Sequence, residues 1–210
     1  MEIDPKHLAL IDKAFAKLSE VAPYERRPTQ LSFGDRAKLV PVFVECFTRF
    51  DPTVKEMRWL KEYDEVCDWL ANNGGKGLFL YGACGRGKTN TILGVIRPLF
   101  LATGISLPGM HASLLPSKSV YHEGWNFESY RKWKYSYIDE LGTEKMVNDY
   151  GEKFEPFTEI INKAEQDLDI LVITSNLTPD QFLQRYGDRS MDRIRRLCKA
   201  VEFKGESLRP

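Results

Sequence analysis

Residues 77–89 form an apolar run that breaks into a glycine-rich turn and ends in Lys-Thr (GLFLYGACGRGKT). Four of them fill the pattern G-x-x-x-x-G-K-[ST]: Gly82, Gly87, Lys88 and Thr89. In this pattern backbone N–H groups surround phosphates, the lysine reaches the β and γ oxygens, and the hydroxyl binds Mg²⁺. Glycine is required because a backbone wound tightly around an anion adopts conformations that a Cβ blocks. We therefore predict a phosphate-binding loop (P-loop), and we count Gly85, Arg86 and Asn90 with its nucleotide-binding residues.

Two carboxylates follow a second apolar segment, Tyr135–Ile138, which we predict to be a strand. In a nucleotide-hydrolysing site an aspartate at such a strand end holds the water shell of Mg²⁺, and a glutamate polarises the attacking water. We predict Thr89 and Asp139 as metal-binding residues and Glu140 as a catalytic residue.

Asn176 comes directly after another predicted strand, Asp169–Thr174. The carboxyl ends of parallel strands meet at the edge of the sheet where ligands bind, so this amide is placed to orient the attacking water or to sense the γ-phosphate. Taken alone, an asparagine here is equally well explained as a turn residue that ends the strand.

Residues 185–196 (RYGDRSMDRIRR) contain five arginines: Arg185, Arg189, Arg193, Arg195 and Arg196. Arg189 and Arg193 are four residues apart and therefore share one helical face. A run of this kind is usually a solvated charged surface. The alternative is an arginine finger, a guanidinium that stabilises charge on the phosphoryl group transferred in the next subunit.

Hydrophobic periodicity and chain breakers predict the elements that position these residues. Before the P-loop we expect a helix over 5–20, an apolar segment over 34–50 that is broken or bent at Pro41, and a helix over 53–72. After it we expect a helix from Thr89, a strand within 104–115, a helix over 152–166, a short helix that Thr178 caps with Pro179 at its first position, and a strand over 200–204.

Residues 116–134 interleave aromatic and basic side chains. Such a segment can stack bases and hold phosphates of single-stranded DNA, although it is more often a packed surface segment.

The composition limits the class of protein. The chain has 210 residues, of which 42% are hydrophobic and 29% are charged, and its 30 basic residues balance its 30 acidic ones. We expect one main domain, and any contact with nucleic acid must come from a local patch rather than from net charge. The sequence shows neither a membrane span nor a signal-peptide core, so we expect a cytoplasmic protein with no membrane partner. The four cysteines and three histidines support neither a zinc site nor a disulfide framework.

The segments GACGRGKT, YIDELG, ITSNL, RYGDRSMDRIRR and GESLR together resemble the small AAA+ ATPases that comprise the DnaC/DnaI helicase loaders and the IstB transposition helpers. The resemblance runs from about residue 60 to the end of the sequence. It implies an α/β P-loop fold with a five-stranded parallel sheet flanked by helices, and ATP as the nucleotide. It also implies that Asn176 is sensor 1, that Arg193 is the arginine finger with Arg189 as a second candidate, and that Arg209 is the sensor 2 residue.

We therefore divide the chain into a helical N-terminal arm, 1–60, which either binds a partner or covers the core, and an ATPase domain, 61–210. The arm matches no partner-binding region of these families, and the chain lacks the zinc cluster of the DnaI branch.

The leading hypothesis is an ATPase that self-assembles through its arginine finger and helps to place a replicative helicase on single-stranded DNA. The alternatives are a transposition helper that acts with a transposase and a nucleotide-gated scaffold with negligible hydrolysis.

Overall fold

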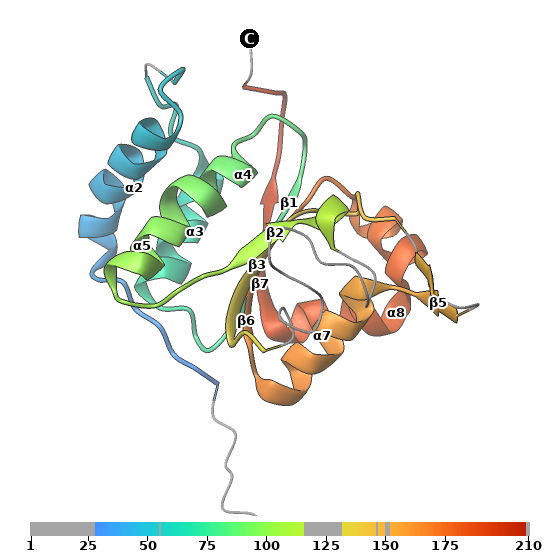
Figure 1. The fold of residues 1–210 in the computed structure, drawn as a ribbon. Helices are drawn as coiled ribbons and strands as arrows, with labels where there is room; N and C mark the ends of the chain where they lie inside the picture. Colours follow the sequence, from blue (N-terminus) through green and yellow to red (C-terminus); the bar gives the residue numbers. More distant parts are fainter. Residues whose placement is uncertain (1–27, 55, 116–131, 146, 150–151, 209–210) are drawn as a thin grey trace, which may run out of the picture.

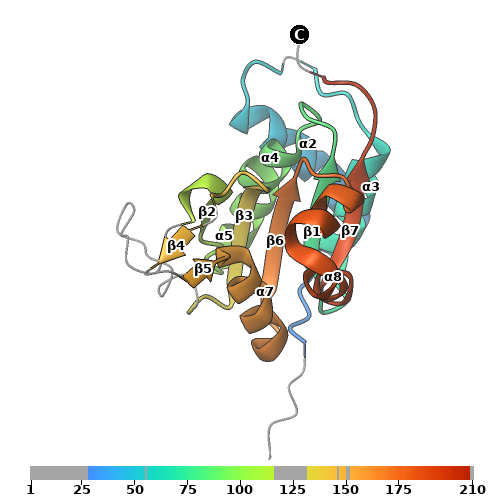
Figure 2. The same cartoon turned by 90° about the vertical axis from the view of Figure 1, so that its right-hand side faces the viewer.

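The computed structural model describes residues 28–54, 56–115, 132–145, 147–149 and 152–208. Its centre is a five-stranded sheet in the order β2-β3-β6-β1-β7, in which all neighbours are parallel (Figure 2). The strands are β1 (Gly77–Gly82), β2 (Gly109–His111), β3 (Tyr135–Leu141), β6 (Ile170–Ser175) and β7 (Cys198–Phe203). The predicted α/β fold with a five-stranded parallel sheet is confirmed, and the last strand begins two residues earlier than expected.

Helices cover both faces of the sheet (Figure 1). One face carries α2 (Arg36–Phe50), α3 (Lys61–Ala71) and the continuous helical segment α4 (Lys88–Asn90), η1 (Thr91–Ile96) and α5 (Arg97–Ala102); the other carries α7 (Pro156–Asp167) and α8 (Pro179–Leu197). Successive side chains of a strand point to opposite faces. Accordingly, Leu78 and Leu80 belong to the hydrophobic cluster under the first group, whereas Phe79 belongs to the cluster under α7 and α8.

Helix α2 continues through Pro41, where a break or bend was expected. Proline inside a helix removes one backbone hydrogen bond, and tertiary packing outweighs that loss here. Leu39, Phe43 and Phe47 of α2 are buried in the same cluster as residues of α3 and η1. This part of the predicted N-terminal arm therefore covers the core, while the helix predicted over 5–20 lies outside the described residues and the boundary at residue 60 stays a prediction.

The helix predicted over 53–72 begins only at Lys61, so its first part was predicted wrongly. Asp51 ends α2 and its carboxylate accepts hydrogen bonds from the backbone N–H and the hydroxyl of Thr53, at 3.2 and 2.5 Å. A side chain that bonds the backbone two residues ahead stabilises a turn in competition with a helix. Trp59 then packs against Phe43 and the Tyr63 ring, and Leu60 is extended before α3 begins.

The helix predicted over 152–166 begins at Pro156 instead. Proline is favoured at the first helical position, and it keeps the preceding residue extended; Glu155 has φ −110° and ψ 100°. Residues before it form a short antiparallel pair that the sequence did not indicate, β4 (Val147–Asp149) with β5 (Glu152–Phe154).

Strand β2 lies within the segment predicted to hold one and leads into the single-turn helix η2 (Ala112–Leu114). Most of the aromatic and basic segment 116–134 lies outside the described residues.

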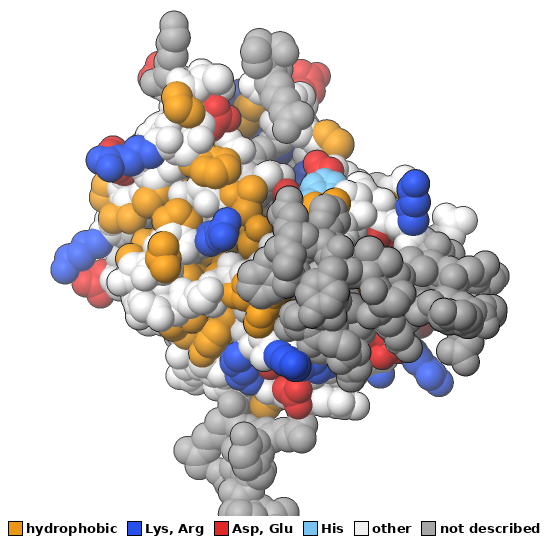
Figure 3. All heavy atoms as spheres, viewed as in Figure 1, with side chains coloured by type: hydrophobic (Ala, Val, Ile, Leu, Met, Phe, Trp, Pro, Cys, Tyr) orange, Lys and Arg blue, Asp and Glu red, His pale blue; other side chains and the backbone are white. Residues whose placement is uncertain are grey.

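On the face that carries α2 and α5, hydrophobic side chains gather at the surface (Figure 3), and the exposed ones include Val42, Phe50 and Leu101. Within the described ranges, no helix combines the length and the apolar character needed to cross a membrane.

Candidate nucleotide-binding site

The P-loop connects β1 to α4 and turns through glycines with positive φ: Gly82 (118°), Gly85 (71°) and Gly87 (85°). At Gly87 a Cβ would lie 2.7 Å from the Tyr63 hydroxyl oxygen and 3.0 Å from Cζ of Phe47. At Gly82 it would lie 2.4 Å from the Phe203 carbonyl oxygen. The glycines are therefore required both by the backbone conformation and by the close approach of neighbouring elements.

The Lys88 side chain turns back over the P-loop and is 6% exposed. Its ammonium group donates to the carbonyl oxygens of Gly82 at 2.9 Å and Ala83 at 2.7 Å. These two bonds hold the ammonium group of Lys88 against the backbone of the P-loop. The lysine is therefore positioned as the G-x-x-x-x-G-K-[ST] pattern requires.

The predicted helix after the loop is confirmed over 88–102, but residues 91–96 form a π-helical turn within it. The hydroxyl and the backbone N–H of Thr91 both donate to the Gly87 carbonyl, at 2.9 and 2.8 Å. A π-turn widens the helix by one residue per turn and often occurs at functional sites. Here it lies in the first turns behind the P-loop.

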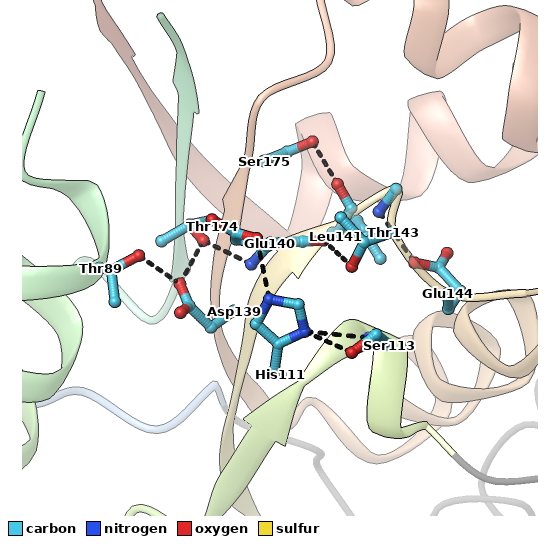
Figure 4. A network of polar contacts seen from close by, with 11 residues as sticks. Thr89, His111, Ser113, Asp139, Glu140, Leu141, Thr143, Glu144, Thr174 and Ser175 are labelled. Atoms are coloured by element: carbon cyan, nitrogen blue, oxygen red, sulfur yellow. Dashed lines mark hydrogen bonds and ion pairs between the residues drawn. The ribbon is translucent and has the colours of Figure 1, made fainter. Parts of the chain in front are cut away.

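The carboxylate of Asp139 on β3 links helix α4 to strand β6 (Figure 4). Oδ1 of Asp139 accepts hydrogen bonds from the Thr89 hydroxyl at 3.1 Å and the Thr174 hydroxyl at 2.6 Å. The Thr174 oxygen in turn accepts the backbone N–H of Glu140 at 2.8 Å. The residues predicted to bind Mg²⁺, Thr89 and Asp139, are therefore in direct contact although they lie 50 positions apart.

Glu140 has a positive φ of 55°, and the pairing of β3 with β6 is irregular at this point. Its Oε2 lies 2.8 Å from Nε2 of His111 on β2 (Figure 4). Nδ1 of His111 accepts the backbone N–H of Ser113 at 3.2 Å, so in the neutral imidazole the proton is on Nε2, which donates to Glu140. The sequence did not single out His111, because its contact arises only from the register in which β2 pairs with β3.

One cavity of about 570 Å³, a size typical of ligand sites, lies beside the P-loop. Its lining includes residues 84–90, Glu140, Thr174 and Asn176. Asn176 follows the carboxyl end of β6 directly and lies on the same cavity as Glu140, and its role as sensor stays a prediction. The rest of the lining was not predicted, and it includes these residues from α2, the following loop and α3: Phe47, Asp51, Thr53, Val54, Glu56, Met57, Arg58 and Tyr63.

Two residues counted with the P-loop also anchor it. Asn90 donates to Oδ2 of Asp51 at 2.9 Å, which ties α4 to the end of α2. The Arg86 guanidinium forms a buried ion pair with Glu62 on α3 at 3.2 Å and donates to the Glu206 carbonyl at 3.2 Å. Because its charge is already paired within the chain, the Arg86 side chain holds the loop in place.

The arginine-rich segment lies in α8, which Thr178 caps as predicted, with its hydroxyl accepting the Gln181 N–H. The helix leaves helical geometry at Gly187 (φ 76°, ψ 171°).

Arg193 donates to Glu165 of α7 at 2.7 Å. Arg189 is exposed and, within the described ranges, makes no hydrogen bond or ion pair. Of the two finger candidates, Arg189 is thus the more exposed and the one without an ion pair within the described ranges, and the choice between them stays a prediction; Arg209 lies outside the described residues.

The residues present fit ATP with Mg²⁺. The P-loop turns through glycines with positive φ, at positions where a Cβ would clash with neighbouring residues. The hydroxyl of Thr89 and the carboxylate of Asp139 are hard oxygen donors, which Mg²⁺ prefers. The cavity lining also includes hydrophobic and aromatic side chains that suit a nucleobase, namely those of Phe47, Val54, Met57 and Tyr63.

Among known proteins, several with solved structures are similar to this chain. No family model and no curated protein matches the chain. A crystal structure of the DnaC helicase loader is 18% identical over 61% of this chain and 78% of that one, with a TM-score of 0.49. A crystal structure of DnaI is 22% identical over 61% and 73%, with a TM-score of 0.48. AMPPCP-bound DnaA from Aquifex aeolicus is 18% identical over 62% and 41%, with a TM-score of 0.46. In fold, the chain is similar to these DnaC, DnaI and DnaA structures.

Proposed function

We propose that the chain binds ATP with Mg²⁺, hydrolyses it, and acts in DNA replication as a protein of the helicase-loader type. The observation that carries the ATPase part is the contact of Thr89 with Asp139, since it joins the P-loop to the end of β3 and places Glu140 on the same cavity. The loader part rests on the sequence segments that resemble DnaC and DnaI.

In this proposal each group of the site has one task. The P-loop N–H groups and Lys88 bind the phosphates, while Thr89 and Asp139 hold the metal ion, which supplies charge neutralisation on the phosphates. Glu140 polarises the attacking water and Asn176 orients it. Glu140 can take this role once its carboxylate is released from His111.

The proposed site needs a cation from a second copy of the chain. Arg189 is exposed and lies beyond the Gly187 kink, where it is free to meet the phosphates bound by a neighbouring subunit. An arginine finger of this kind stabilises the charge of the transferring phosphoryl group and raises turnover by about 10³-fold or more. ATP-dependent self-assembly is therefore part of the proposal. We also propose that the assembled protein acts on single-stranded DNA.

The ATPase part is tested with Lys88→Ala, which deletes the phosphate-directed charge. We expect ATP affinity or turnover to be largely lost. Lys76→Ala removes the same charge from an exposed position at the other end of β1 and serves as the control, with activity kept. Equal nucleotide binding and turnover in both variants would refute the site.

The client is tested by mixing the purified chain with the replicative helicase of its host, with and without ATP. The same mixtures are made with the Lys88→Ala variant. We expect an ATP-dependent complex with the wild-type chain and none with the variant. Association with a transposase instead would make the protein a transposition helper. If ATP turnover is negligible and Glu140→Gln does not change it, the protein would be a nucleotide-gated scaffold.

A further inference from the structure

A buried carboxylate next to the site, Glu144, joins two parts of the chain that serve different steps of the proposed reaction. Its side chain is 0% exposed and lies in the turn that follows β3, four residues after Glu140. Oε2 of Glu144 accepts the Gly142 N–H at 2.8 Å, which closes the turn (Figure 4).

The same turn holds the backbone of the catalytic residue. The Thr143 hydroxyl donates to the Glu140 carbonyl at 2.9 Å. The Ser175 hydroxyl donates to the Leu141 carbonyl at 2.7 Å and so ties the turn to the end of β6. The location of the Glu144 carboxylate is therefore set by the end of the catalytic strand.

On its other side Glu144 meets α8. The Tyr186 hydroxyl donates to Oε1 of Glu144, and Arg185 donates to the Glu144 carbonyl while its Nη2 lies 3.4 Å from Oε1. The Tyr186 ring is packed against Phe157 and Phe182. A buried carboxylate is tolerated only where hydrogen bonds and a counter-charge satisfy it, so this contact strongly favours one arrangement.

Helix α8 is interrupted directly after this contact. Gly187 adopts a backbone conformation that is essentially restricted to glycine, and Arg189 follows two residues later. Gly187, Asp188 and Arg189 are exposed, whereas Tyr186 before them and Ser190 after them are buried. The direction in which Arg189 points therefore depends on the anchors on both sides of the kink, and the Glu144 contact is the anchor on the N-terminal side.

We infer that Glu144 and Tyr186 are positioning residues for Arg189, because they fix the start of the kinked segment to the turn that follows Glu140. A subunit's arginine finger is thereby held in a defined place relative to its own catalytic turn. The inference rests on the proposed function, since it requires Arg189 to act in the site of a neighbouring subunit.

The test mixes subunits that each lack one half of the reaction. A Glu140→Gln subunit keeps its finger but not its own hydrolysis, and an Arg189→Ala subunit keeps its site but not its finger. We expect their mixture to hydrolyse ATP faster than either alone. Tyr186→Phe, which keeps the packed ring and removes only the hydroxyl, is then added to one subunit at a time.

Added to the Glu140→Gln subunit, Tyr186→Phe should lower the turnover of the mixture about tenfold, because that subunit supplies the finger. Added to the Arg189→Ala subunit, it should change turnover less than about twofold. Tyr135→Phe in the Glu140→Gln subunit is the control, since it removes a hydroxyl beside Phe100 on the opposite face of the sheet. It should have no effect.

Equal losses in both arrangements would mean that Tyr186 serves general stability, and no loss in either would mean that the contact does not position Arg189; both results overturn the inference while leaving the proposed finger intact. A mixture without any gain over its components would refute the finger in the neighbouring subunit, and with it the inference.

Discussion

Replacing Thr174 with valine tests the connection between the helix after the P-loop and strand β3, which carries Asp139 and Glu140. Thr174 is 1% exposed and its hydroxyl makes two hydrogen bonds, to the Asp139 carboxylate and from the Glu140 N–H. Valine has nearly the same shape but neither donates nor accepts. The change therefore removes a hydrogen bond to an ionised group and leaves a backbone N–H without its partner.

Each of these losses costs about 1–3 kcal/mol, so we expect Thr174→Val to lower the free energy of unfolding by about 3 kcal/mol. For a chain of about this size, that corresponds to a fall in Tm of roughly 6–12 °C. Thr174→Ser is the matched control. It keeps the hydroxyl and loses one buried methyl group, at a cost of about 1 kcal/mol.

The assay is thermal unfolding without nucleotide, followed by circular dichroism, together with steady-state ATP hydrolysis. Thr174→Val should also slow hydrolysis more than Thr174→Ser, because Asp139 and Glu140 both lose a positioning contact. If the serine variant is as unstable as the valine variant, the methyl packing and not the hydroxyl supports this site, and the reasoning is refuted.

Three other perturbations have defined outcomes. His111→Ala removes the hydrogen bond that holds the Glu140 carboxylate, so basal turnover should rise while the Kd for ATP changes less than about twofold; unaltered turnover would show that the contact does not restrain Glu140. Gly187→Ala meets no atom within 4 Å, so its cost of about 1–3 kcal/mol in urea unfolding comes from the backbone alone, and an unchanged midpoint would argue against the kink. Burial and then the charge of Glu144 raise the pKa of the Glu155 carboxyl to about 7. The folded protein therefore binds a proton that the unfolded chain releases near pH 4.5, so stability should fall by about 2 kcal/mol between pH 4.5 and 7, and Glu155→Gln should flatten that fall.

The features predicted correctly from the sequence are those that local chemistry determines. The glycines and Lys88 of the P-loop, the strand that begins at Tyr135, and the Thr178 cap each depend on residues a few positions apart. Their physical cause lies in backbone conformation and in hydrogen bonds to the adjacent backbone, so the pattern alone is informative.

The features that were missed depend on partners far along the chain. The ion pair of Arg193 with Glu165 could not be predicted, because Glu165 belongs to another helix. The contact of His111 with Glu140 required the register of two strands. The residues after Asp51 have helical periodicity, but a turn and the packing of Trp59 override it and leave them lining the cavity.

The attachment of the P-loop to the end of the described chain has a consequence for protein synthesis. Leu208 donates its N–H to the Gly85 carbonyl, Ala83 donates to the Phe203 carbonyl, and Arg86 bonds to the Glu206 carbonyl, 120 positions away. A ribosome adds about 5–20 residues per second, so roughly 6–24 s separate the synthesis of the loop from that of the segment that supports it. During that interval the loop lacks these contacts, and a nascent chain cannot hold nucleotide in its final geometry. Chaperone demand should therefore be concentrated late in translation, when β7 has yet to pair with β1.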